Sequence, residues 1–170
     1  MTAHTAADTA HLSSRMPPQS NEVERGVLGA MIRDNDAIDD VLDVLAAEDF
    51  YLDAHRKIAA VVFDLHRDGK PADTVVLFEE LRRRKQLDDV GGAEYLADLW
   101  DAVPTAANAV YYAGIVREKA KARAIIHAGT VAARDAHDST DSADEIAARL
   151  EREVADATGD RRGRPRSPRG

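Results

Sequence analysis

The chain contains no cysteine, few aromatic residues and no long apolar run. Without cysteine it can form neither a disulfide scaffold nor a cysteine-based zinc site, and such a chain is compatible with a reducing cytoplasm. No stretch approaches the roughly 20 apolar residues that a membrane-spanning helix needs. The first 20 residues also lack the apolar centre of a signal peptide. These absences predict a soluble, cytoplasmic protein without a membrane anchor.

Sequence motifs of enzymatic chemistry are missing as well. There is no GxxxxGK[ST] phosphate loop, no HExxH, no GxSxG and no calcium-binding loop. His55 and His66 share one face of a predicted helix but lie about three turns apart, too far to share a metal ion. We expect both to be surface or partly buried polar residues. The sequence therefore predicts no catalytic residue, no cofactor and no metal ligand in this chain.

Acidic residues outnumber basic ones, and their distribution is uneven. The formal net charge is −8, yet residues 161–170 carry five arginines and no acid. The remainder has 18 basic against 31 acidic residues, a net charge of −13. Because nonspecific affinity for nucleic acids comes largely from Lys and Arg that neutralise phosphates, the body of the protein is a poor candidate for binding DNA by itself.

Clusters of charged residues are also expected to lie on solvent-exposed helix surfaces. The adjacent acids Asp39-Asp40, Glu79-Glu80 and Asp88-Asp89 point in different directions on a helix, so we expect solvated faces and not acid–base pairs. The run 82–85, RRRK, is interpreted as a charged helix end that complements the helix dipole, with an anion contact as the alternative. Residues 161–170 are interpreted as a linker, or as a contact for nucleic acid or an acidic partner.

Apolar residues recur at helical spacing, and no strand-like alternation occurs. The predicted fold class is all-α: a compact bundle of short helices followed by a long antiparallel helical hairpin. We divide the chain into a disordered leader (1–19), a globular helical subdomain (20–104), a helical hairpin (105–158) and a basic disordered linker or tail (159–170). Each helix of the hairpin is apolar along a narrow stripe, so the pair buries little surface, and a second copy is its simplest partner.

Local signals place the helix ends. Ser20 or Asn21 can cap the first helix. Asn21 with Glu24 resembles a capping box, and so does Ser142 with Glu145. Asp73 and Asn108 are predicted helix caps. Gly91-Gly92 breaks the chain and is expected to supply positive φ angles.

A series of short segments, in order and spacing, resembles the amino-terminal domain of DnaB-type replicative DNA helicases. The segments are NEVERGVLGAM at 21–31, EDFY at 48–51, HRKI at 55–58, GKPAD at 69–73 followed by Leu81, GGAEYL at 91–96, VPTAAN at 103–108 and YAGIVREK at 112–119. Each match is weak alone, but the whole series is specific. The resemblance runs from about residue 20 to about residue 158 and fades in the second hairpin helix.

The resemblance implies a collar that stabilises a hexameric ring. Hairpins pair, six subunits form three dimers, and the collar docks the carboxy-terminal domain of primase and, in some members, a helicase loader. ATP and Mg²⁺ would bind a motor domain that is absent from this chain, and single-stranded DNA would be contacted only through the parent helicase. The alternative is a stand-alone motorless relative that regulates or recruits a helicase.

Two sets of residues follow from the resemblance. The expected hairpin or oligomer interface consists of Ile115, Ile126, Val131, Ile146, Leu150 and Val154. The expected structural positions of the family motifs are Gly29, Phe50, His55, Asp73, Gly92, Pro104 and Asn108. Physical roles can be given to several of these: Gly29 lets two helices approach closely, Phe50 anchors a loop, and Pro104 closes the globular part.

Overall fold

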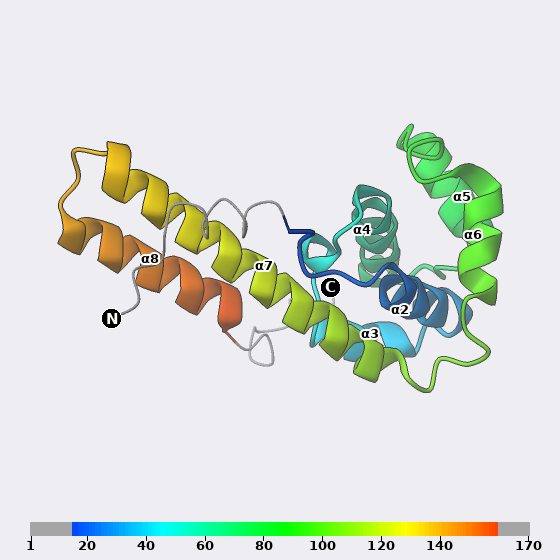
Figure 1. Cartoon of the computed structure of the whole chain (residues 1–170). Coiled ribbons are helices and arrows are strands. Elements are labelled where there is room, and N and C mark those ends of the chain that lie inside the picture. Colours follow the sequence, from blue (N-terminus) through cyan, green and yellow to red (C-terminus); the bar gives the residue numbers. More distant parts are fainter. Residues whose placement is uncertain (1–14, 160–170) are drawn as a thin grey trace.

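The computed structural model describes residues 15–159, and all regular structure in this range is helical (Figure 1). The predicted all-α class is therefore confirmed. Most of the predicted leader and tail, residues 1–14 and 160–170, lies outside the described range. Between residues 15 and 159, no helix combines the length and the apolar character needed to cross a bilayer.

A group of short helices precedes a hairpin of two longer ones. The short helices are α2 (Asn21–Arg33), α3 (Ala37–Leu42), the 3-10 turn η1 (Ala47–Asp49), α4 (Asp53–Arg67), α5 (Thr74–Arg83) and α6 (Gly92–Asp101). We call this group the globular subdomain. The hairpin consists of α7 (Ala109–Asp138) and α8 (Ala143–Thr158), which extend away from it side by side (Figure 1).

Helix α2 occupies the centre of the globular subdomain. It packs against α4, α6 and the first half of α7, and residues 26–32 are buried without interruption. A helix that is apolar on all sides is expected to be surrounded by other elements. The largest buried side chains around it include Met31, Phe50, Ile58, Leu77 and Leu99, which belong to one continuous core.

Two of the glycine predictions are confirmed. A Cβ atom on Gly29 would collide with the backbone carbonyl of Leu99, so only glycine lets α2 and α6 pack this closely. Gly91 and Gly92 have φ angles of 98° and 72°, a region that side chains disfavour. They turn the chain into α6 at the predicted position.

The predicted caps have mixed outcomes. The Asp73 side chain accepts hydrogen bonds from the backbone N–H groups of Val75 and Val76, both at 2.9 Å, as expected. Asn108 does precede α7, but its side chain makes no capping hydrogen bond. The capping box of Asn21 with Glu24 is wrong. The residue that caps α2 is Ser20. Glu24 is buried and makes its side-chain hydrogen bonds to residues far from this helix end in the sequence.

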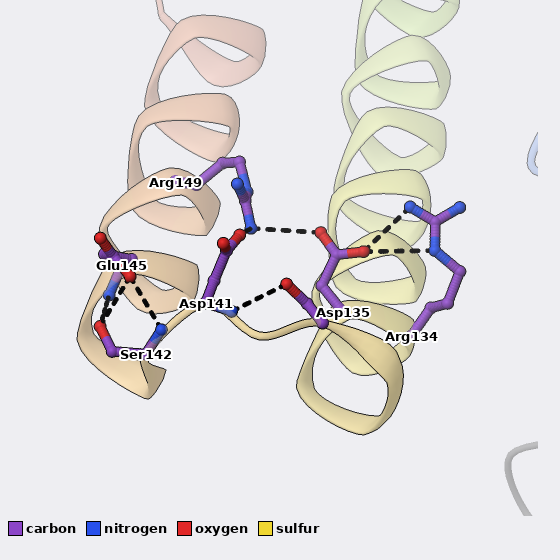
Figure 2. A network of polar contacts seen from close by, with 7 residues as sticks. Arg134, Asp135, Asp141, Ser142, Glu145 and Arg149 are labelled. Carbon is purple, nitrogen blue, oxygen red and sulfur yellow. Dashed lines mark hydrogen bonds and ion pairs between the residues drawn. The ribbon is translucent and has the colours of Figure 1, made fainter.

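The turn of the hairpin is held by polar contacts, which Figure 2 shows. Ser142 and Glu145 form the predicted capping box at the start of α8. Arg149 of α8 donates to Asp135 of α7 at 3.2 Å and to Asp141 of the turn at 3.0 Å. The hydrogen bond from Arg149 lowers the pKa of Asp141. Because Arg149 and Asp141 are largely exposed to solvent, their ion pair stabilises the turn little, and the turn depends mainly on the cap and on helix packing.

Candidate functional site: the hairpin and its junction

The expected interface residues divide between two faces of the hairpin. Helix α8 packs on α7, and its least exposed apolar positions are Ile146, which is 9% exposed, and the half-buried Leu150 and Val154. We call this the inner seam. Ile126 is instead 54% exposed. Ile115 and Val131 are half-buried on α7. The role of these six residues in an oligomer stays a prediction.

Helix α7 carries a second apolar surface that faces solvent. The positions at spacings of three, four, seven and eleven from the first form what we call the outer stripe: Ala122, Ile125, Ile126, Gly129 and Ala133. Ile125 and Ile126 are 47% and 54% exposed, and no atom lies within 4 Å of where a Cβ of Gly129 would be. The stripe contains no charge. Exposed apolar surface of this kind often marks an interaction site.

Arg117 joins the hairpin to the globular subdomain. Its guanidinium donates to Asp49 Oδ1 at 3.0 Å and to the carbonyl oxygens of Ala157 and Gly159 at 2.8 and 3.2 Å. Asp49 belongs to η1, whereas Ala157 and Gly159 lie at the carboxy-terminal end of α8. A cation at this position satisfies orphan carbonyls and complements the helix dipole. The buried Arg117 side chain therefore connects α7 both to η1 and to the end of α8.

Arg123, two turns further along α7, makes a second connection. It donates to the carbonyl oxygens of Pro18 and Asp49 at 2.7 and 2.5 Å, and its guanidinium lies 5.4 Å from the centre of the Tyr51 ring. Burial lowers the pKa of Arg123 from its usual value. Sequence reasoning missed this residue, because a lone arginine in a charged helix has no local signal. Arg117 lies within a matched family segment but had received no role.

A buried polar network lies at the centre of the globular subdomain. The imidazole of His55 is fully buried; its Nδ1 lies 2.6 Å from Glu24 Oε2 and its Nε2 lies 2.7 Å from the Tyr95 hydroxyl. Glu24 Oε1 accepts a hydrogen bond from the Tyr51 N–H at 2.6 Å. Burial raises the pKa of Tyr95, although Arg25 opposes the shift. The expectation of a surface or partly buried His55 is wrong, because two other helices, α2 and α6, supply partners that satisfy its ring.

Several other charged residues form pairs on helix surfaces. In the run 82–85, Arg82 pairs with Glu79, and Arg83 and Arg84 both pair with Glu80. Hydrogen bonds from Arg83 and then Arg84 lower the pKa of Glu80 to about 2. These contacts match a charged helix end. The half-buried His66 pairs with Asp39 at 3.0 Å, as expected for a polar residue near the surface.

Within the described part of the chain, no group of three or more His, Asp or Glu side chains could hold a metal ion. The adjacent acids are used in separate contacts. Asp39 faces His66, and Asp89 accepts a hydrogen bond from Lys57 at 2.7 Å. The features of this molecule that invite a functional interpretation are therefore surfaces and the contacts that position them.

Replacing Arg117 with methionine is expected to loosen the end of α8 and to lower the free energy of unfolding by about 3 kcal/mol, because the buried Asp49 carboxylate loses the cation beside it and the end of α8 loses a donor to its carbonyl groups. Hydrogen exchange should then accelerate in the last turn of α8. Arg134→Met on the same helix is the control, since that side chain is 65% exposed and should change stability by less than about 0.5 kcal/mol. Unchanged exchange in α8 would refute the role given to Arg117.

The chain is similar in sequence to a known family of proteins. A family model described as the DnaB-like helicase N terminal domain matches residues 16–118. A replicative DNA helicase DnaB of Mycobacterium leprae is 43% identical over 159 residues, which cover 91% of this chain and 26% of that protein. One of Geobacillus stearothermophilus is 40% identical over 146 residues, which cover 86% of this chain and 32% of that protein.

The fold is also similar to a solved structure. The crystal structure of the N-terminal domain of DnaB helicase from Mycobacterium tuberculosis superposes with a TM-score of 0.79 at 43% identity and covers 83% of this chain and 99% of that one. The present chain thus spans between a quarter and a third of the length of the two curated relatives. The family model covers more than half of the chain, and the chain belongs to the DnaB-like helicase N-terminal domain family.

Proposed function

We propose that the chain serves DNA replication as the assembly module of a DnaB-type helicase. In this proposal, the hairpins of two copies pair through the outer stripe of α7, and three pairs form a six-membered collar. The observation that carries the proposal is the solvent-facing outer stripe, whose isoleucines are about half exposed in a single copy. ATP hydrolysis and contact with single-stranded DNA are assigned to the motor domain of such a helicase and not to these residues.

The composition of the outer stripe supports direct contact between the outer stripes of two copies. A two-fold symmetric interface brings the same surface of both copies together, so the stripe would meet itself. Its small residues Ala122, Gly129 and Ala133 would let two α7 helices approach, while Ile125 and Ile126 would fill the space between them. Each buried isoleucine side chain would contribute roughly 1 kcal/mol.

The proposal also includes docking. Membership in the family supports an interaction with the carboxy-terminal domain of primase and with a helicase loader. We assign this docking to the globular subdomain, because the hairpin would be occupied by a second copy.

Ile126→Asp is expected to shift the chain from a self-associated form to a monomer, because pairing would bury an unpartnered carboxylate. Sedimentation velocity over a range of concentrations measures this directly. Val110→Asp is a matched control: Val110 is 42% exposed on the same helix but lies off the stripe. Leu150→Asp is less informative, because Leu150 lies in the inner seam and its loss would disrupt the hairpin itself.

Two outcomes would contradict the assembly role. One is an unaltered chain that stays monomeric at every concentration tested. The other is an Ile126→Asp variant that sediments like the unaltered chain, which would place the interface elsewhere.

A further inference from the structure

Residues of α5 and α6 line an open groove. The two helices lie at the end of the molecule opposite the hairpin turn (Figure 1). Its volume is about 650 Å³, and most of its lining is apolar. The apolar lining consists of Val75 and Phe78 from α5 and of Ala93, Leu96, Ala97 and Trp100 from α6. The outer stripe of α7 contributes nothing to it, so the groove is a separate surface.

The exposure of these apolar residues is not a by-product of core packing. Helix α5 is anchored in the core by Leu77 and Leu81, both fully buried. Val75 is 70% exposed, although nothing in the core requires an apolar residue there. Glu79 and Arg82, exposed positions on the same helix, are charged and paired with each other. Exposed apolar surface on α5 is therefore confined to the groove.

Trp100 forms one wall of the groove, and contacts with Arg33 hold it in position. The guanidinium of Arg33 lies 4.6 Å from the centre of the indole and donates a hydrogen bond to the Trp100 carbonyl at 2.8 Å. The indole is 36% exposed. A fixed aromatic wall lowers the entropy lost on binding, and tryptophan is enriched among the residues that dominate binding energies.

The charges of the groove lie at one end. Residues 84–91 join α5 to α6 at one end of the pair, so the chain reverses direction and the start of α5 lies beside the end of α6 (Figure 1). Asp73 and Asp101 occupy these two positions, and both line the groove. No basic residue lines it. A complementary ligand thus has an apolar face and a cation at one end.

These requirements select one kind of occupant. Two neighbouring helices present a groove into which a third helix packs with side chains at i, i+3 or i+4, and i+7. The basic segment 161–170 has cations but no Val, Leu, Ile, Phe or Met to fill an apolar floor. We propose that the α5–α6 groove docks a short amphipathic helix of another protein, with a Lys or Arg at the end nearest Asp73 and Asp101. This inference stands whether or not the hairpins pair.

The full chain can test the proposal with synthetic peptides. The first peptide is a capped helix with leucines at i, i+3, i+4 and i+7, otherwise Ala and Gln, and two lysines at one end. The second carries glutamates in place of the lysines, and the third has the composition of the first with its leucines scattered. Trp100 is the only tryptophan of the chain, so its fluorescence reports on the groove when the peptides contain no aromatic residue.

The lysine peptide is expected to give a saturable change in Trp100 fluorescence and to bind about fivefold more tightly than the glutamate peptide. In the Asp101→Lys variant this preference should be lost or reversed. Val75→Glu should weaken binding of the lysine peptide. Val110→Glu is the matched control, because it places the same charge on an exposed valine of α7 and should leave the affinity unchanged. Helical circular dichroism confirms that each variant is folded.

Several results would overturn the proposal. No saturable response, equal affinity for the scattered peptide, or a charge preference that Asp101→Lys leaves unchanged would each remove the groove as a docking site of this chemistry. Tighter binding of a peptide of sequence 161–170 would make the chain's own basic segment the occupant. A change in the sedimentation coefficient caused by Val75→Glu, with no change from Val110→Glu, would make the occupant a second copy.

Discussion

Glu24→Ala is expected to lower the free energy of unfolding by about 3–5 kcal/mol, because it breaks a buried pair and leaves its partner without an acceptor. The carboxylate accepts from the backbone N–H of Tyr51 and contacts His55, both at 2.6 Å. Alanine would leave Nδ1 of the fully buried His55 and the half-buried N–H of Tyr51 without the carboxylate oxygens that they contact, while His55 keeps only its contact with Tyr95.

Urea unfolding followed by circular dichroism measures this loss. Glu22→Ala is the matched control: it removes the same side chain from the same helix at an exposed position and should change stability by less than about 0.5 kcal/mol. Glu24→Gln keeps one acceptor oxygen and should lie between the two, so it remains measurable if Glu24→Ala does not fold. Equal stability of the Glu22→Ala and Glu24→Ala variants would show that the network stabilises nothing.

Gly29→Ala is expected to destabilise the chain by about 2–3 kcal/mol, since the new methyl group would meet the backbone of α6 and not a side chain that can rotate away. The atom that it would strike is the carbonyl oxygen of Leu99. Either α2 and α6 separate, which opens the core on both sides, or the backbone of α6 distorts. Neither response is inexpensive in a close-packed interior.

The matched substitution is Gly114→Ala in α7. Nothing lies within 4 Å of a Cβ built on Gly114, so alanine should raise stability there by roughly 0.5–1 kcal/mol through its higher helix propensity. Thermal unfolding of both variants therefore tests for a change of opposite sign. A Gly29→Ala variant that is as stable as the unaltered chain would mean that the close approach of α2 and α6 is not a requirement of the fold.

The helices themselves could be predicted from the sequence, because apolar periodicity and capping residues are local. Residues 105–158 are predicted as a helical hairpin, and the two helices of that hairpin are α7 (Ala109–Asp138) and α8 (Ala143–Thr158). Asp73 and the pair Ser142–Glu145 cap helices as predicted, since their partners lie within three residues. In each case the residues that interact lie within a few positions of one another in the sequence.

Long-range contacts could not be predicted in the same way. Glu24 sits three positions after a possible cap, which fits a capping box, yet its partners lie 27 and 31 residues further along the chain. Arg123 contacts Pro18, 105 residues earlier. Val75 is apolar yet exposed, because the face of α5 that enters the core is set by Leu77 and Leu81. Such choices depend on where other helices lie, and local sequence does not contain that information.

The uninterrupted course of α7 has a mechanical consequence. The helix begins against the globular subdomain and continues to the hairpin turn, and Arg117 and Arg123 clamp its first half. From Arg117 to Asp138 it extends roughly 30 Å, so tilting the globular subdomain by about 10° would carry the tip through about 5 Å. The geometry thus makes the hairpin a lever arm, and in the proposed assembly small rotations at its base would reach a neighbouring copy as large displacements.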